Sequence, residues 1–166
     1  AEVMPLLREV GVRVVTQPGF IRERGDQYLQ AIAASEHGDL YRCHSLLHEG
    51  IPLAGSTDAP YGDCDPWAAM RAAVQRSTPS GMLLGEAERL NPEQALALFT
   101  SAADDPGGDS REIAVGATAD LCLLDRGWES ARLRLRSDDV MATIRRGELI
   151  YHRERQDIAG LVICER

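Results

Sequence analysis

The hydrophobic pattern at the start of the chain predicts a helix followed by a strand, and the same order returns further along. Residues 2–10 carry apolar side chains at the spacing of one helical face, namely Val3, Leu6, Leu7 and Val10. Gly11 supplies a helix stop, and the β-branched residues in 12–17 predict a strand. Leucines, a glycine and an apolar run recur in this order at 46–55. Successive β/α units produce such a repeat, which predicts adjacent parallel strands at 12–17 and 51–55.

The second of these strands ends in small polar residues and then a carboxylate, Asp58. An apolar run closed by glycine and proline is typical of a strand covered on both faces, as in parallel sheets. Because the chemistry of α/β folds takes place at the carboxyl ends of the strands, Asp58 stands where a working carboxylate is expected. An aspartate in this position can also cap the following helix or hold a turn, so both interpretations stay open.

Two later helix starts are clearly marked, at Asp65-Pro66 and Asn91-Pro92, each with an N-cap residue and proline at the first helical position. His44 and His48 have the spacing of the zinc-binding pair in His-Glu-x-x-His. Ser45 stands where that motif has its basic glutamate, which favours ordinary packing and surface histidines over a metal role.

The pattern changes from helical to strand-like about two thirds of the way along the chain. Residues 104–110 are polar and rich in helix breakers, and beyond them short strand-like runs follow at 119–124, 140–145 and 149–151. We therefore expect three segments, a first part at 1–104, a second part at 111–152 and a C-terminal tail at 153–166.

Several stretches resemble the amidohydrolase superfamily, and its family 3 in particular, in that family's order. They are Gly55-Ser56-Thr57-Asp58-Ala59-Pro60, Asp65-Pro66-Trp67, residues 73–78, residues 116–125 and residues 140–151. The resemblance covers most of residues 1–152. It implies an α/β fold, with the last β/α units of a (β/α)8 barrel in the first part and strands of a small β-sandwich in the second. A complete barrel takes about 250 residues, so this 166-residue chain is expected to be the C-terminal portion of a larger enzyme.

Members of this family are metal-dependent hydrolases of amide and related C–N bonds. The resemblance implies that Asp58 is both a metal ligand and the catalytic base that takes a proton from the attacking water. The family's histidine ligands would lie before residue 1. The divalent metal, expected to be zinc, therefore belongs to the complete enzyme, and this chain alone would hold it weakly or not at all. The expected function is cleavage of an amide or other non-peptide C–N bond, with the isolated chain inactive.

Residues 18–39 are longer than an ordinary connection between a strand and a helix. Such length favours a functional loop or lid, and the family's Gln-Pro-x-Phe strand end matches residues 17–20. We expect Phe20 and Arg22 to bind substrate, although a solvated loop with one aromatic anchor fits the pattern equally well.

The composition of the chain limits the classes of partner that it is expected to bind. A net charge of −8 and a pI near 5.0 argue against nucleic acid, and no apolar run approaches the roughly 18 residues of a membrane-spanning helix. The four cysteines are far apart, which predicts reduced, mostly buried thiols in a cytoplasmic protein. The expected partners are a small-molecule substrate and the remainder of the barrel, with a homo-oligomer left open. The alternative is a non-catalytic α/β interaction or regulatory module, in which Asp58 caps a helix.

Overall fold

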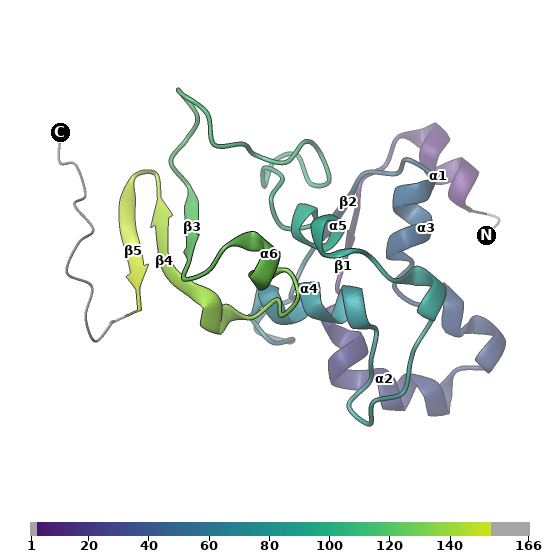
Figure 1. Cartoon of the computed structure of the whole chain (residues 1–166). Coiled ribbons are helices and arrows are strands. Elements are labelled where there is room, and N and C mark those ends of the chain that lie inside the picture. Colours follow the sequence, from purple (N-terminus) through teal and green to yellow (C-terminus); the bar gives the residue numbers. More distant parts are fainter. Residues whose placement is uncertain (1–2, 154–166) are drawn as a thin grey trace.

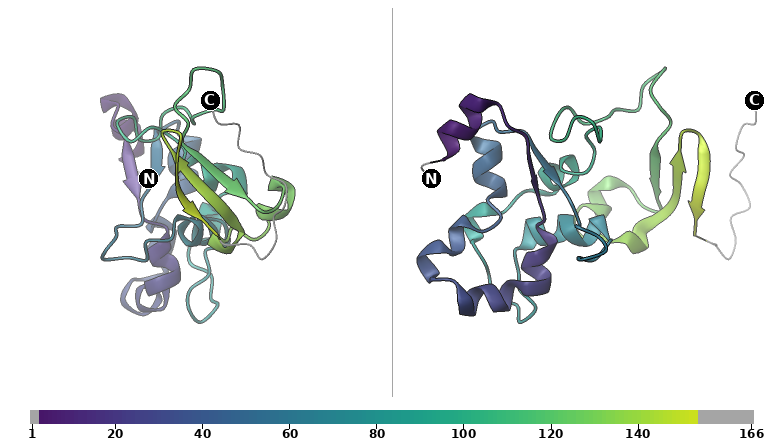
Figure 2. Two further views of the ribbon diagram at one scale, coloured as in Figure 1. Left: turned by 90° about the vertical axis from the view of Figure 1, so that its left-hand side faces the viewer. Right: turned by 180° about the vertical axis from the view of Figure 1, so that it is seen from behind.

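The computed structural model describes residues 3–153, which form a mixed α/β structure with two separate sheets (Figure 1). A parallel pair of strands lies among helices in the N-terminal part, whereas three antiparallel strands form a sheet at the opposite end (Figure 2). The elements in chain order, with 3₁₀ helices marked η, are α1 (Met4–Val10), β1 (Val14–Thr16), α2 (Gly19–Ala31), η1 (Ala34–Asp39), α3 (Cys43–His48), β2 (Leu53–Gly55), α4 (Pro66–Gln75), η2 (Glu86–Glu88), α5 (Pro92–Ala97), β3 (Leu121–Leu124), α6 (Trp128–Ala131), η3 (Ser137–Asp139), β4 (Val140–Arg145) and β5 (Glu148–His152).

The strands β1 and β2 are parallel neighbours, as the repeat in the sequence predicts. Their register begins with Val14 opposite Leu53. The glycines that precede the two strands, Gly11 and Gly50, have left-handed φ values of 71° and 70°. Glycine adopts this conformation without side-chain strain, so both helices end at a residue that allows the chain to turn into the strand.

The prediction of a loop or lid at 18–39 is wrong, because this stretch folds as α2 and η1. Phe20, Ile21 and Gly25 are buried on α2. A Cβ added at Gly25 would lie 2.5 Å from the methyl carbon of Thr78, so the close packing requires a residue without a side chain. Glycine lowers the helix propensity of the stretch, and tertiary packing overrides that preference here.

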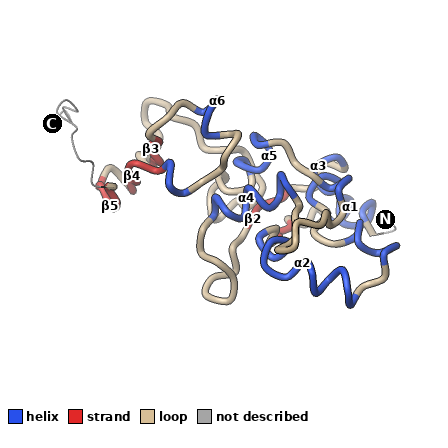
Figure 3. Tube along the Cα trace, turned by 60° about the horizontal axis from the view of Figure 1, so that its bottom comes forward, coloured by secondary structure: helices blue, strands red, loops and turns tan. Residues whose placement is uncertain are grey.

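Both predicted helix starts are confirmed. Asp65 caps α4 by accepting a 2.9 Å hydrogen bond from the backbone N–H of Trp67. Asn91 and Gln94 form a reciprocal capping box at the start of α5. The helices gather around the parallel strands (Figure 3). Their common core consists of Met4, Cys43, Leu46, Ile51, Leu53, Trp67, Met70, Ala73, Leu90, Ala95, Leu98, Leu135 and Val140.

The antiparallel sheet has the order β3-β4-β5, at the places that the sequence predicts. The β4–β5 hairpin turns at Arg146 and Gly147, which have φ values of 50° and 85°. Positive φ at both central residues is the pattern of a type I′ turn, which matches the twist of paired strands. Every residue of β5 is exposed. The closed barrel and the β-sandwich stay predictions, because residues 3–153 contain this sheet and the two-stranded pair.

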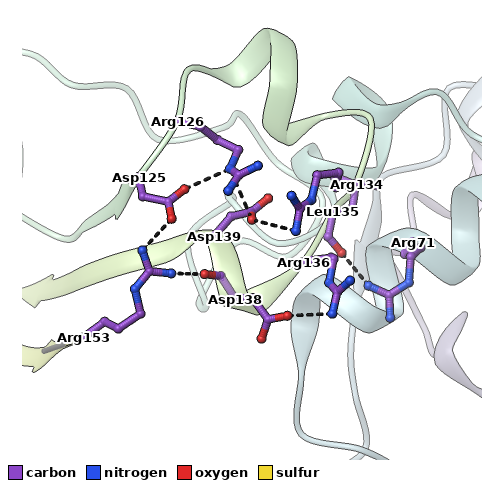
Figure 4. A network of polar contacts seen from close by, with 9 residues as sticks. All are labelled: Arg71, Asp125, Arg126, Arg134, Leu135, Arg136, Asp138, Asp139 and Arg153. Atoms are coloured by element: carbon purple, nitrogen blue, oxygen red, sulfur yellow. Dashed lines mark hydrogen bonds and ion pairs between the residues drawn. The ribbon is translucent and has the colours of Figure 1, made fainter. Parts of the chain in front are cut away.

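The segment between β3 and β4 connects the antiparallel sheet to the helices (Figure 4). Arg71 of α4 donates a 2.7 Å hydrogen bond to the carbonyl of Leu135, whose side chain is buried in the common core. At the sheet, Asp125 accepts hydrogen bonds from Arg126 and Arg153. The segment thus anchors the sheet to α4, while the predicted division of the chain into parts stays a prediction.

The cysteines correct one expectation. Cys43 is buried, but Cys64 and Cys122 are exposed, so the prediction of mostly buried thiols is wrong for the described residues. Cys64 lies in the turn-rich loop before α4, and Cys122 lies on strand β3 of the antiparallel sheet. Across residues 3–153, no helix combines the length and the hydropathy needed to cross a membrane. Cys164 and the predicted tail lie outside the described residues, apart from Arg153.

Candidate active site at the end of strand β2

Asp58 lies in the loop that follows β2, and hydrogen bonds fix its backbone. Its φ of 56° is left-handed, a conformation that costs a residue with a Cβ roughly 1 kcal/mol. Its N–H donates to Ser56 Oγ at 3.1 Å. Its carbonyl accepts from the N–H groups of Tyr61 and Gly62 at 2.8 and 3.1 Å. The loop therefore closes on the Asp58 backbone and sets the direction in which its side chain leaves the chain.

The carboxylate of Asp58 is exposed, and within residues 3–153 it takes part in no hydrogen bond or ion pair. It stands on the side of β1 and β2 where both strands end, the edge at which α/β folds bind ligands. A carboxylate without a partner is available as a hydrogen-bond acceptor, a metal ligand or a base.

The interpretation of Asp58 as a helix cap is wrong, whereas the alternative that it holds a turn is confirmed by the hydrogen bonds to its carbonyl. The residue that caps α4 is Asp65, as described above. Asp65 also accepts a 2.8 Å hydrogen bond from the hydroxyl of Ser137, which fastens the start of α4 to η3. Asp65 thus has a structural role with both carboxylate oxygens in use, in contrast to Asp58.

The two predicted substrate residues lie on α2 and have different environments. Phe20 is buried, and its ring packs beneath the loop at Tyr61 with the centroids 5.8 Å apart. Arg22 is exposed and lines a cavity of about 30 Å³ together with Thr57 and Asp63. That volume holds about one water molecule. The packing role of Phe20 is therefore visible, while substrate contact by Phe20 and Arg22 stays a prediction.

Arg24 and Tyr61, which join α2 to the loop of Asp58, are not among the residues predicted from the sequence. The Arg24 guanidinium carbon lies 4.4 Å from the Phe20 ring centroid and 4.0 Å from the Tyr61 ring centroid. Phe20 and Arg24 are four positions apart and share one helical face. This signal is readable in the sequence only when residues 19–31 are taken as a helix.

The aromatic group beside the loop continues to Tyr41, 6.5 Å from the Phe20 ring. The hydroxyl groups of Tyr41 and Tyr28 lie 2.9 Å apart. Burial raises the pKa of Tyr41 well above its usual value, and the hydrogen bond with Tyr28 raises the pKa further. Tyr41 therefore stays protonated near neutral pH and cannot act as the base.

His44 and His48 are exposed on α3, with their rings stacked at 6.1 Å between centroids. They line a cavity of about 360 Å³ with Met4 and Arg42. In the part of the chain that the structure describes, no three His, Cys, Asp or Glu side chains are grouped to hold a metal ion. Within the described residues, the histidine pair and Asp58 therefore belong to no common metal-binding group.

The fold and the loop together define an α/β chain that presents a free carboxylate where its parallel strands end. Residues 1–151 match the model of the amidohydrolase family. The chain belongs to this family, which confirms the resemblance seen in the sequence.

Named relatives are consistent with this assignment. The N-substituted formamide deformylase of Arthrobacter pascens is 29% identical over 152 residues, which are 89% of this chain and 28% of the deformylase. Crystal structures of uncharacterized metal-dependent hydrolases from Pyrococcus horikoshii and Pyrococcus furiosus superpose with TM-scores of 0.51 and 0.50, at 28% and 29% identity. Each superposition covers 60% of this chain and 20% of the other. The chain therefore spans less than a third of the length of each relative.

Proposed function

We propose that this chain is the C-terminal portion of a metal-dependent hydrolase that cleaves an amide or other non-peptide C–N bond. The observation that carries the proposal is the exposed carboxylate of Asp58, held on a left-handed backbone at the carboxyl edge of β1 and β2 without a partner among residues 3–153. Membership of the amidohydrolase family supports the reaction class.

Amide hydrolysis needs a base because water is a weak nucleophile near neutral pH. Asp58 accepts a proton from the attacking water as the new C–O bond forms. It then delivers that proton to the nitrogen as the C–N bond breaks, so the carboxylate is regenerated at the end of the cycle. A divalent metal would polarise the carbonyl and favour deprotonation of water. The exposed carboxylate of Asp58 at the carboxyl edge of β1 and β2 supports both proton transfers.

The donor set in this chain fits part of a metal site. A carboxylate oxygen is a suitable ligand for zinc, the metal that we propose for the complete enzyme. Asp58 would supply one ligand, since residues 3–153 contain no group of three metal-binding side chains. The remaining ligands would come from the rest of the barrel. This chain on its own would then bind the metal weakly, because a single carboxylate does not offset the hydration that the ion loses.

The substrate that we propose is a small amide. The name of the Arthrobacter pascens relative describes it as acting on N-substituted formamides, and N-substituted amides are therefore the first class to assay. Arg22, exposed beside the loop of Asp58, is the better placed of the two predicted substrate residues, since Phe20 is covered by the loop.

The experiment uses the complete protein that carries this segment. It is purified, assayed on a panel of N-substituted formamides and acetamides, stripped with a chelator and reloaded with zinc. We expect hydrolysis that is lost on stripping and restored by the metal, whereas the 166-residue chain alone should show neither activity nor equimolar metal. Hydrolysis that survives complete metal removal, or a tightly held equimolar metal in the short chain, would contradict the proposal.

A further inference from the structure

Arg24 of α2 contacts both an aromatic ring of its own helix and the loop that carries Asp58. Its guanidinium lies against the rings of Phe20 and Tyr61, 4.4 and 4.0 Å from their centroids. The two rings meet edge to face, with 76° between their planes. Arg24 Nη2 also donates a 3.4 Å hydrogen bond to the Tyr61 carbonyl. A planar guanidinium suits this place, since it can stack on a ring and donate in its own plane.

Tyr61 is in turn hydrogen-bonded to the backbone of Asp58. The N–H of Tyr61 donates to the Asp58 carbonyl at 2.8 Å. The Tyr61 side chain is 67% exposed, so few contacts other than those with Arg24 and Phe20 hold its ring. Arg24 is therefore connected to Asp58 through Tyr61, by a ring contact and a hydrogen bond from Arg24 to Tyr61 and a backbone hydrogen bond from Tyr61 to Asp58.

Neighbouring contacts tie the next residues of the loop to the same face of α2. A Cβ added at Gly62 would lie 3.0 Å from the Phe20 ring and 2.3 Å from the Thr57 carbonyl oxygen, so the loop packs tightly here. The N–H of Asp63 donates to Glu23 Oε1 at 3.1 Å. The loop is thus held at three consecutive residues, and Arg24 holds the residue bonded to Asp58.

We propose that Arg24 is a positioning residue, which fixes the turn of Asp58 through its stacking on Tyr61 and thereby holds the carboxylate in place for catalysis. This inference rests on the proposed function of Asp58. Within residues 3–153 Arg24 forms no ion pair, so its removal leaves no charged partner behind. The cation–π contact and the hydrogen bond with Tyr61, each of ordinary strength, together correspond to a change of about five- to thirtyfold in the opening of the loop.

The first measurement is hydrogen exchange of the backbone amides in residues 58–64, followed by mass spectrometry. We expect Arg24→Ala to accelerate exchange there by about five- to thirtyfold while the peptides of α4 and the β-sheet are unchanged. Arg24→Lys keeps the charge but loses the planar stack, and should restore part of the protection. Gln27→Ala, an exposed change on the same helix, is the matched control and should leave exchange unaltered. Unaltered exchange in Arg24→Ala overturns the proposal.

The second measurement is steady-state kinetics of the complete enzyme. We expect Arg24→Ala to lower kcat by about five- to thirtyfold with a smaller change in KM, and Arg24→Lys to recover part of the loss. Faster exchange with unchanged kcat overturns the positioning role, provided that Asp58→Asn abolishes turnover. If Asp58→Asn is itself active, the proposed function fails and the positioning role fails with it. Hydrogen exchange distinguishes the two failures. Faster exchange in Arg24→Ala shows that the contact with Tyr61 exists even if the proposed function of Asp58 fails.

Discussion

The left-handed backbone at Asp58 is informative because no contact of its side chain explains it. Arg76 shows the contrast, since it is also left-handed, with φ 50°. Its fully buried guanidinium donates to the carbonyls of Leu84, Tyr41 and Leu40 at 2.7 to 2.9 Å. There the fold gains three hydrogen bonds in return for a strained backbone. At Asp58 the backbone N–H and carbonyl make the hydrogen bonds that close the loop, while the side chain has no hydrogen-bond or ion-pair partner among residues 3–153.

Gly11 and Gly107 have almost the same φ but different surroundings, so comparing them distinguishes the cost of backbone strain from the cost of a steric clash. Gly107, at φ 73°, lies against β2, and a Cβ there would be 2.3 Å from the Leu53 nitrogen. Gly11, at φ 71°, has no atom within 4 Å of the same position. We expect Gly11→Ala to cost about 1 kcal/mol of unfolding free energy. Gly107→Ala should cost about 1–3 kcal/mol more, because the backbone of β2 must also move.

Urea unfolding of the two glycine variants measures this difference. Equal losses would show that the loop of Gly107 does not rest on β2 in solution. Greater loss at Gly107 would establish that contact through energy as well as geometry.

At the scale of the element, helix caps and turns were predictable because their signals are local. The capping box at Asn91 and the turn at Arg146 and Gly147 depend on residues within four positions of one another. The parallel pairing of β1 and β2 was predictable for a related reason, since the unit that produces it occurs twice.

The part that the sequence could not reveal depends on contacts between distant segments. Gly25 of α2 packs closely on Thr78, and no local sequence pattern predicts this contact between distant segments. The contact of Arg24 with Tyr61 depends on the helical geometry of α2, so it does not follow from a sequence pattern that predicts a loop there. The place of Asp58 after a strand is readable in the sequence, but its left-handed turn follows from the closed loop around it.

The polar network at the end of the antiparallel sheet predicts a pH dependence of stability. Hydrogen bonds from Arg126 and then Arg153 lower the pKa of Asp125 from 3.8 to about 2. A lowered pKa means that its stabilising contribution is complete above the unfolded-state value and is lost as the pH falls through about 2. We therefore expect Asp125→Asn to be less stable than the unchanged protein at pH 7, with the difference shrinking between about pH 4 and pH 2.

Urea midpoints measured at a series of pH values test this expectation. Asp138→Asn is the control, because that carboxylate is 67% exposed and bonded by Arg136 at the surface, where an ion pair contributes little. A stability difference for Asp125→Asn that is constant down to pH 2 would contradict the network shown in Figure 4.

At the scale of the whole molecule, one core joins the parallel strands, the helices and the segment that leads to the antiparallel sheet. Leu135 and Val140 share this core with residues of α3, β2 and α4. The loop of Asp58 connects β2 to α4, and α2 packs against it through Phe20 and Tyr61. The exposed apolar side chains of β5 and of α1 are surfaces that the rest of a barrel or a second copy could cover. Both partners stay predictions.

The central claim is that Asp58 is the base, and the turnover of Asp58→Asn in the complete enzyme tests it most directly. Asparagine tolerates a left-handed backbone as well as aspartate does, so the loop should keep its shape while the base is removed. We expect kcat to fall by at least about 10²- to 10⁴-fold, with a smaller loss of bound metal. Asp109→Asn, an exposed change in another loop, should leave kcat unaltered. Turnover of Asp58→Asn close to that of the unchanged enzyme would contradict the account.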